Sequence, residues 1–409
     1  MPASFHPTRS AGLEQLRVAL PRLGDYARDR GFDRPDRPTT SRLSPYLQRR
    51  LITEEEVVSA LSMALPWPRA EKFVQEVCWR TYWKGWLEHQ PAVWSRYRDA
   101  VVALRAAPPP GYADAVAGRT GIEGFDDWVR ELVAHGWLHN HARMWFASIW
   151  IFTLRLPWEL GADFFLRHLL DGDPAANTLS WRWVAGLHTP GKTYLARAAN
   201  IALHTDGRFS PQGLATEAIA LTEPPLPAPI SPWIEPPRAP ASGPTGLWIH
   251  PEDLCAEKIL LGEPAPTAVL ALWPESLAAT EGWSDTVATF GQAALADGAG
   301  RAAEALGAPL EVERVADVGT AAAVWAQTHG LRTVIALRPT TGPWADAGRA
   351  IERSLASVGI TLAWRQRTWD ARLFPHANRG FFPFWTAAKA VIQPVRNPAN
   401  QSLTTDAQG

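Results

Sequence analysis

Hydrophobic residues recur at helical spacing through the first half of the chain. This period predicts helices over residues 10–30, 70–90, 123–135, 137–155 and 159–170. A further helix opens at Thr53, because Thr53 and Glu56 have the spacing of a capping box. The alternating pattern of a β-strand is missing before residue 220. The first part of the chain is therefore predicted to be an all-α domain.

The second half shows a different pattern, in which short β-branched runs alternate with alanine-rich segments. The runs lie at residues 246–250, 267–273, 310–315, 332–338 and 360–364. Helical segments near 284–306, 317–329 and 343–358 separate the later runs. This alternation predicts a parallel, Rossmann-like α/β sheet covered by helices. HPEDL follows the first run in place of a glycine-rich turn, so the fingerprint of dinucleotide binding is absent.

A proline-rich segment separates the two patterns. Residues 222–245 contain nine prolines in 24 positions, which excludes a helix or a central strand. We predict an all-α domain over 1–221, an extended linker over 222–245, an α/β domain over 246–390 and a disordered tail over 391–409.

Composition and charge narrow the class of protein. Hydrophobic residues make up 46% of the chain and charged residues 20%, as in globular proteins with real cores. A run of about 18 apolar residues and an apolar signal core at the N-terminus are both missing, so we expect a cytoplasmic protein outside the membrane. Two distant cysteines, Cys78 and Cys255, exclude a disulfide framework. The net charge of −1 argues against strong nucleic-acid binding, although residues 1–210 carry +4 (26 − 22).

Polar side chains are unusually dense among aromatic residues between residues 136 and 183. This stretch carries His139, Asn140, His141, Arg143, Asp171, Asp173, Asn177, Trp181 and Trp183. Such groups are costly to bury unless they bind something, and we expect a large, flat, polar-edged cofactor. The two aspartates also suit acid–base chemistry or metal binding. Neither a third acid nor a histidine pair on one helix face accompanies them, so no metal is predicted.

Two earlier segments allow two interpretations each. Residues 40–44, Thr-Ser-Arg-Leu-Ser, suit a diphosphate at a helix start or an ordinary N-cap cluster. Glu76, Trp79 and Arg80 share a helix face, which suits a pocket wall or a core tryptophan beside a surface ion pair.

The order of these segments resembles the FAD domain of the photolyase/cryptochrome family over residues 10–215. TTSRLSPYL, FVQEVCWRTY, GWLHNHARM and DGDPAANTLSWRWVAG carry the resemblance. It implies a bound FAD. By this resemblance, the residues at the FAD phosphates are Tyr26, Thr40, Ser41, Leu43 and Ser44. The residues along the flavin ring and ribose are Asn140, Arg143, Asp171, Asp173 and Asn177, with Asn177 near the reactive flavin nitrogen.

The resemblance also implies a pocket for a flipped-out pyrimidine dimer. Its residues are Glu76, Trp79, Arg80, Asn140, Met144 and Trp183. The branch that repairs (6-4) photoproducts has histidines at Asn140 and Met144. The implied activity is therefore that of a carbon–carbon lyase, which repairs cyclobutane pyrimidine dimers in DNA by electron transfer from reduced FAD under blue light. The alternative is a cryptochrome-like photoreceptor that signals to a protein partner.

Three departures from the family accompany this resemblance. His141 stands where the family usually has an arginine that contacts DNA. Trp181 and Trp158 match the inner members of the family's electron-transfer chain, but residues 100–108 hold no tryptophan, which leaves Trp94 or Trp145 as substitutes. The α/β part follows the FAD domain, the reverse of the usual order. GLWIHPEDL and HANRGFFPFW resemble the start and end of the family's antenna domain, which implies a relocated antenna domain with an unknown second pigment. We expect a monomer.

Overall fold

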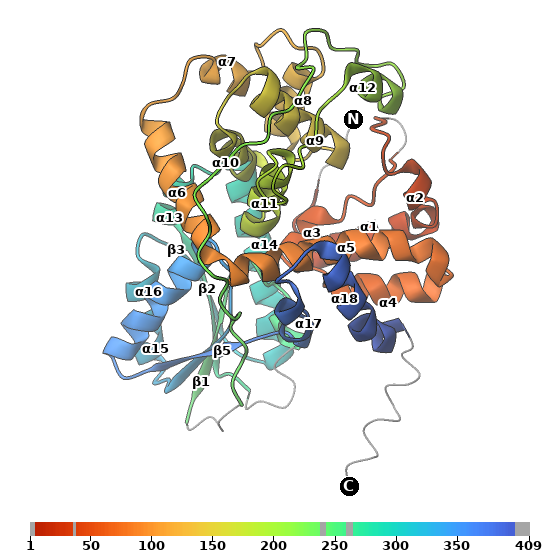
Figure 1. Ribbon diagram of the computed structural model, residues 1–409. Coiled ribbons are helices and arrows are strands. Elements are labelled where there is room, and N and C mark those ends of the chain that lie inside the picture. The colour runs from red at the N-terminus through yellow and green to blue at the C-terminus, as the bar shows by residue number, and fades with distance from the viewer. Residues whose placement is uncertain (1–4, 36–37, 238–242, 259–264, 397–409) are drawn as a thin grey trace.

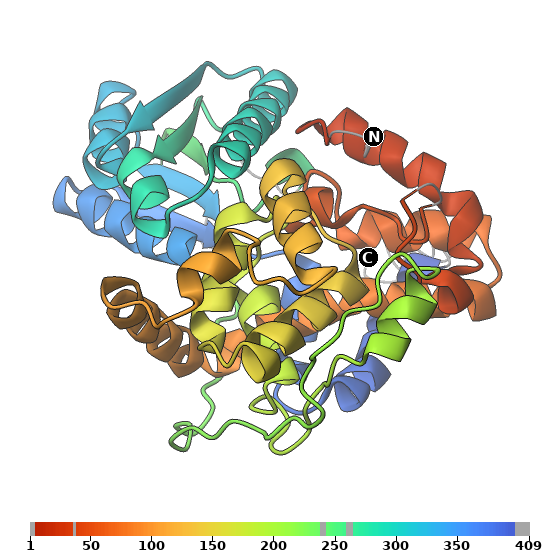
Figure 2. The same cartoon turned by 90° about the horizontal axis from the view of Figure 1, so that it is seen from above.

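The computed structural model describes residues 5–35, 38–237, 243–258 and 265–396. A helical part and a sheet-containing part lie side by side (Figures 1 and 2). The helical part comprises α1 (Arg9–Leu23), α2 (Tyr26–Asp29), α3 (Ser44–Gln48), α4 (Glu54–Ala64), α5 (Trp67–His89), α6 (Pro91–Ala106), α7 (Tyr112–Val116), α8 (Phe125–His135), α9 (Asn140–Ser148), the π-helix η1 (Ile149–Thr153), α10 (Trp158–His168), α11 (Pro174–Val184) and α12 (Ala198–His204). Among the described residues before 245 there is no strand, as predicted.

Local sequence signals account for several of these helices. The capping box predicted for α4 is formed, since Glu56 N donates to Thr53 Oγ1 at 3.3 Å and Thr53 N donates to Glu56 Oε2 at 2.9 Å. The helix predicted over 137–155 begins instead at Asn140, after a cap in which His139 Nδ1 accepts from His141 N at 3.2 Å. The second half of this predicted helix is the π-helix η1, and short π-helical turns often occur at functional sites.

The sheet-containing part has the predicted alternation of strands and helices. Its elements are β1 (Thr245–Ile249), η2 (Ala256–Lys258), β2 (Ala268–Pro274), α13 (Glu275–Glu281), α14 (Asp285–Leu306), β3 (Leu310–Val315), α15 (Val318–Thr328), β4 (Thr333–Leu337), α16 (Pro343–Ser357) and β5 (Thr361–Arg365). All four strand pairings are parallel, in the order β3-β2-β1-β4-β5. Helix α14 covers one face of the sheet, and α15 and α16 cover the other.

Residues 222–237 of the proline-rich segment form neither helix nor strand, and part of this stretch is fixed to the protein surface. Arg96 donates to the carbonyls of Pro224 and Pro225 at 2.8 and 2.9 Å. Ile230 N donates to the carbonyl of His89 at 2.9 Å. These bonds hold residues 224–230 along α5 and α6, so the linker does not act as a free tether.

The last helices return to the helical part, which differs from the predicted domain boundary. Helix α17 (Thr368–Leu373), η3 (Phe374–His376) and α18 (Phe381–Arg396) pack against α5, and α18 also packs against α4 (Figure 1). Residues 391–396, predicted to begin a disordered tail, complete α18. Residues 397–409 of that tail lie outside the described residues. Because the buried side chains of α18 join the same hydrophobic core as α4 and α5, this segment belongs structurally with the first part of the chain.

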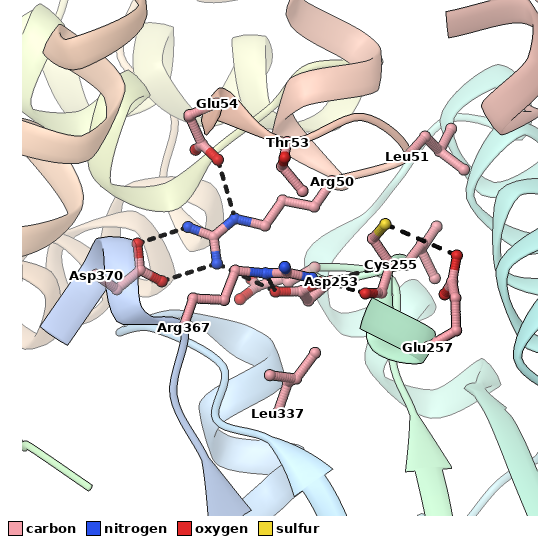
Figure 3. A network of polar contacts seen from close by, with 12 residues as sticks. Arg50, Leu51, Thr53, Glu54, Asp253, Cys255, Glu257, Leu337, Arg367 and Asp370 are labelled. Carbon is pink, nitrogen blue, oxygen red and sulfur yellow. Dashed lines mark hydrogen bonds and ion pairs between the residues drawn. The ribbon is translucent and has the colours of Figure 1, made fainter. Parts of the chain in front are cut away.

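A buried ion network joins the two parts. Arg50, directly after α3, donates to Asp370 of α17 at 2.7 and 2.8 Å and to Asp253 after β1 at 3.1 Å (Figure 3). Arg367 donates to the same Asp253. The backbone of Arg50 has a φ of 49°, a left-handed conformation that costs about 1–2 kcal/mol for a side chain other than glycine. The network therefore holds Arg50 in a conformation that its backbone alone disfavours.

None of the described helices is both long and apolar enough to cross a membrane. Most buried apolar side chains form one continuous core, which runs from α1 through the helical part to the α14 face of the sheet. A second cluster lies between the sheet and α15 and α16. The two parts thus share a core.

Candidate functional site

A cavity of about 520 Å³ lies in the helical part, within the range of cofactor pockets. Helices α5, α9 and α11 and the segment before α3 surround it. The sequence-predicted residues that line it are Tyr26, Thr40, Ser41, Leu43, Ser44, Glu76, Trp79, Arg80, Asn140, Arg143, Met144, Asp171, Asp173, Asn177, Trp181 and Trp183. Of the predicted site residues, Trp158 is the one outside this lining. The predicted residues that the fold brings together here extend over 157 positions of the sequence, from Tyr26 to Trp183.

The hydroxyls of residues 40–44 do not cap α3. The N-cap position of α3 is Leu43, which makes no side-chain cap bond. Ser41 Oγ accepts from Leu43 N at 3.3 Å, and Ser44 Oγ accepts from Trp137 Nε1 at 3.2 Å. The N-cap interpretation is therefore wrong. These hydroxyls line the cavity together with Arg42, and this set of groups suits a phosphate ligand.

Arg143 and Asp171 form a buried ion pair at the cavity wall. Arg143 Nη2 donates to both oxygens of Asp171, at 3.1 and 2.9 Å, and Arg143 Nε donates to the carbonyl of Leu138 at 3.0 Å. The side chain of Asp171 is 2% exposed. The carboxylate and the carbonyl together fix the guanidinium plane beside the cavity.

Asp173 is the N-cap residue of α11 and lies close to two cationic side chains. Its Oδ1 accepts from Ala176 N at 2.8 Å, and its Oδ2 lies 3.2 Å from Lys84 Nζ and 3.8 Å from Arg80 Nη1. Burial opposes ionisation, but the charges of Lys84 and Arg80 outweigh it and lower the pKa of Asp173. Arg80 Nη1 is buried and has no hydrogen-bond partner among the described residues, so a donor at the wall is left for a ligand.

Asn177 and Trp181 are held in place by α10. Asn177 Nδ2 donates to the carbonyl of Ala162 at 2.8 Å, which orients its amide. Trp181 packs over Gly161, where a Cβ atom would come within 2.3 Å of the indole. Glycine is therefore required at position 161 for this close approach.

Glu76 and Trp79 lie on α5 and line the cavity. Glu76 accepts from Arg30 Nη1 and lies 3.7 Å from Lys72 Nζ, so its ion pair reaches across to the chain after α2. Trp79 lines the cavity as well and also packs against the hydrophobic core, so it has features of both interpretations. Trp183, on α11, stacks against Tyr194 at a centroid distance of 5.7 Å.

The environment of His141 disfavours its charged form. Burial, with the charges of His139 and His204, lowers its pKa to about 4. An ordinary histidine gains its charge near pH 6.5. His141 instead stays neutral down to about pH 4, because a charge there would lack solvent.

A series of aromatic contacts leads from Trp158 on α10 to α6. Trp158 is buried and stacks on Tyr97 at 5.7 Å, and Tyr97 lies 5.3 Å from Trp94. Trp145, the other proposed substitute, contacts Trp128, His141 and His204 instead. Of the two candidates, Trp94 is the one connected to Trp158.

Several lining residues were missed by sequence reasoning. They are Arg30, Lys72, Trp83, Trp137, Phe381 and Phe382. Trp83 lies one helical turn beyond Trp79, a spacing from which it could have been found. Phe381 and Phe382 lie about 200 residues beyond the motifs, and no local pattern connects them to the cavity. The described residues hold no group of three or more His, Cys, Asp or Glu side chains that could bind a metal ion.

Comparison with known proteins identifies this part of the chain. Residues 73–213 match the family model of the FAD binding domain of DNA photolyase. The deoxyribodipyrimidine photo-lyase of Streptomyces griseus is 37% identical over 168 residues, which cover 41% of this chain and 36% of that protein. An enzyme of the same name from Thermus thermophilus is 34% identical over 212 residues, covering 51% of this chain and 49% of that protein.

A class III photolyase from Agrobacterium tumefaciens is a solved structure with 26% identity and a TM-score of 0.42, covering 48% of this chain and 42% of that one. The chain thus spans about half or less of the length of the relatives it matches. The family match, residues 73–213, includes most of the residues that line the cavity. Within the helical part, residues 73–213 are therefore similar to the FAD binding domain of DNA photolyase.

Proposed function

We propose that this protein is a FAD-dependent photolyase that repairs cyclobutane pyrimidine dimers in DNA under blue light. The observation that carries the proposal is the shared cavity. The residues expected at a dimer, among them Glu76, Trp79 and Trp183, line the same space as the residues expected at FAD. A substrate and a cofactor in one cavity would lie within reach of each other, as electron transfer requires.

The residues present fit FAD. The hydroxyls of Thr40, Ser41 and Ser44 do not cap α3, and together with Arg42 they suit the diphosphate of FAD. Arg80 Nη1 offers a further hydrogen-bond donor. Arg143, fixed by Asp171, supplies a cation at the cavity wall that favours a negatively charged ring system. The oriented amide of Asn177 offers a hydrogen-bonding group at the same wall. FAD would supply the absorption of blue light and the electron that splits the dimer.

The aromatic walls suit a dinucleotide turned out of the helix. Flipping costs a few kcal/mol, and stacking on an aromatic side chain returns about 1–3 kcal/mol per base. Trp79 and Trp183 offer such faces from α5 and α11. Asn140 and Met144 stand between them in sequence on α9 and line the same cavity, and they favour the cyclobutane dimer over the (6-4) photoproduct.

The sheet-containing part is proposed to be the family's antenna domain, placed after the FAD domain. Doubly wound sheets bind ligands at the carboxyl ends of their strands. At that edge Trp273, Trp283 and Trp344 pack together and leave a cavity of about 40 Å³. This volume is well below that of ligand pockets, so the edge as folded favours tryptophan packing over a second pigment.

The test combines a spectrum with a repair assay. The purified protein should be yellow, and blue light should restore thymines in an oligonucleotide that carries a cyclobutane dimer. Trp181→Phe should keep the bound flavin and slow its reduction in light. A protein that stays colourless after incubation with FAD would contradict the proposal, as would a flavin-loaded protein without repair.

A photoreceptor that signals to a protein partner is the second candidate. The observation in its favour is His141, a neutral side chain at the position where the family usually has a DNA-contacting arginine. Loss of one phosphate-contacting charge weakens DNA binding. Light-driven flavin chemistry without restored thymines would select this candidate.

A further inference from the structure

A short segment from the end of the chain forms part of the cavity rim. Residues 378–382, named here the rim segment, lead from η3 into α18, and both Phe381 and Phe382 line the cavity. The hydroxyl of Tyr82 on α5 donates to the carbonyl of Arg379 at 2.7 Å and fixes the segment to the helix that carries Trp79.

Phe381 covers one face of Trp79. The two rings are parallel within 6°, and their centroids are 3.7 Å apart. Isolated aromatic rings prefer an offset arrangement, so this geometry depends on the surrounding packing of Phe381 against Tyr82 and Phe384. Phe381 is 5% exposed. It therefore covers one face of the indole and holds the Trp79 ring at the cavity wall.

Phe382 and Arg379 point the other way, toward solvent. Phe382 is 75% exposed although it lies at the cavity, and Arg379 is exposed as well. Among the described residues, no hydrogen bond or ion pair holds the Arg379 guanidinium. The cavity beside them is also lined by Arg30 and Lys72, which both lie against Glu76. Grooves that bind unpaired nucleic-acid strands combine exposed aromatic rings with cations, and Phe382 and Arg379 present one of each.

We propose that the rim segment is a further DNA-contacting element, which rests on the proposed function. Phe382 stacks on an unpaired base next to the flipped dinucleotide, Arg379 contacts a backbone phosphate, and Phe381 is a positioning residue that holds Trp79. The partner is a DNA strand with unpaired bases.

The test measures the affinity for a single-stranded oligothymidylate that carries one cyclobutane dimer, at several salt concentrations. Phe382→Ala should weaken binding about 5- to 150-fold, the loss of one stacked base, with an unchanged salt slope. Phe382→Trp should restore binding. Arg379→Gln should reduce the salt slope by about 0.7, the value for one phosphate of a single strand. Val324→Ala, which trims another exposed apolar residue on α15, should change neither quantity.

Phe381 needs its own comparison because it is buried. Phe381→Leu keeps apolar volume but removes the ring, and it should weaken binding, whereas Phe381→Tyr should restore it. Flavin content should stay at the level of the unaltered protein in all variants. Unaltered affinity in Phe382→Ala, with a wild type that binds the strand, would overturn the rim proposal alone. A flavin-loaded wild type that does not bind would overturn both this proposal and the DNA-repair function.

Discussion

The ring of Tyr97 lies 5.7 Å from the ring of Trp158, with 30° between the two planes. Tyr97 belongs to α6 and Trp158 to α10, so the contact bridges two helices. Trp94, one turn earlier on α6, continues the chain at 5.3 Å from Tyr97. The stretch from 100 to 108 lacks a tryptophan, and we propose Tyr97 and Trp94 as an alternative outward route for electrons.

A first prediction concerns this route. Tyr97→Phe and Trp94→Phe should each slow reduction of the bound flavin in blue light, because phenylalanine is much harder to oxidise than tyrosine or tryptophan. Trp145→Phe is the matched control, since the ring contacts of Trp145 lie with Trp128 and the histidines. The rate is followed by flavin absorbance, normalised to bound flavin. Equal rates in all three variants would rule out the Tyr97–Trp94 route.

A second prediction concerns the Arg143–Asp171 pair. Asp171→Asn should lower the free energy of unfolding by about 3 kcal/mol and reduce flavin content, because it leaves a partly buried guanidinium without its counter-charge. Asp114→Asn breaks the exposed pair with Arg119 and should cost at most about 1 kcal/mol. Denaturant unfolding and flavin absorbance measure both effects. A loss in Asp171→Asn no larger than in the control would contradict the assigned role.

A third prediction concerns the interdomain network. Arg50→Met leaves Glu54 and Asp370 buried without the cation they share and should cost about 3–5 kcal/mol. Arg50→Lys keeps the charge but loses the forked contact with Asp370, so its loss should be smaller. Arg314→Met removes an exposed pair with Glu275 and serves as the control. Equal stability of the Met and Lys variants would show that the charge of Arg50 contributes little.

A fourth prediction concerns pH. The folded pKa of His141, about 4, lies below the ordinary value of about 6.5, so the unfolded chain binds more protons between these limits. Its contribution to stability is fully present above pH 6.5 and is lost as the pH falls toward 4. Burial is the largest cause of this lowered pKa, the charges of His139, His204 and Arg30 add to it, and Asp33 opposes it.

A comparison of the wild type with His141→Asn isolates the contribution of His141 to the pH dependence of stability. Between pH 4 and 7, the unfolding free energy of the wild type should rise more steeply with pH than that of the variant. Glu252, whose pKa burial raises to about 7, contributes the opposite slope in both proteins and cancels in the difference. Parallel curves would show that His141 titrates as an ordinary exposed histidine.

The sequence was informative where local pattern decides structure. The capping box at Thr53 and the run over 310–315 appear in the structure at their predicted positions, because hydrogen bonding between near neighbours and side-chain alternation determine them. Part of the cavity lining was also predicted, since the motifs that carry it lie within one half of the chain and occur in a recognisable order.

Contacts between distant segments were not predictable. The pairing of Arg50 with Asp370 spans 320 positions, and neither residue carries a signal of the other. The place of Phe381 on Trp79 depends on how α18 folds back, and the low pKa of His141 depends on burial by three segments. A buried environment is a property of the whole fold, so local patterns could not reveal these features.

Because α18 packs against α4 and α5, the segment that matches the family is shorter than the part of the chain that completes the hydrophobic core. The family match ends at residue 213, whereas the hydrophobic surface of α5 is completed by side chains beyond residue 373, including Phe384 and Ala388. A fragment truncated at the linker would bare this surface and should self-associate rather than yield a smaller soluble flavoprotein.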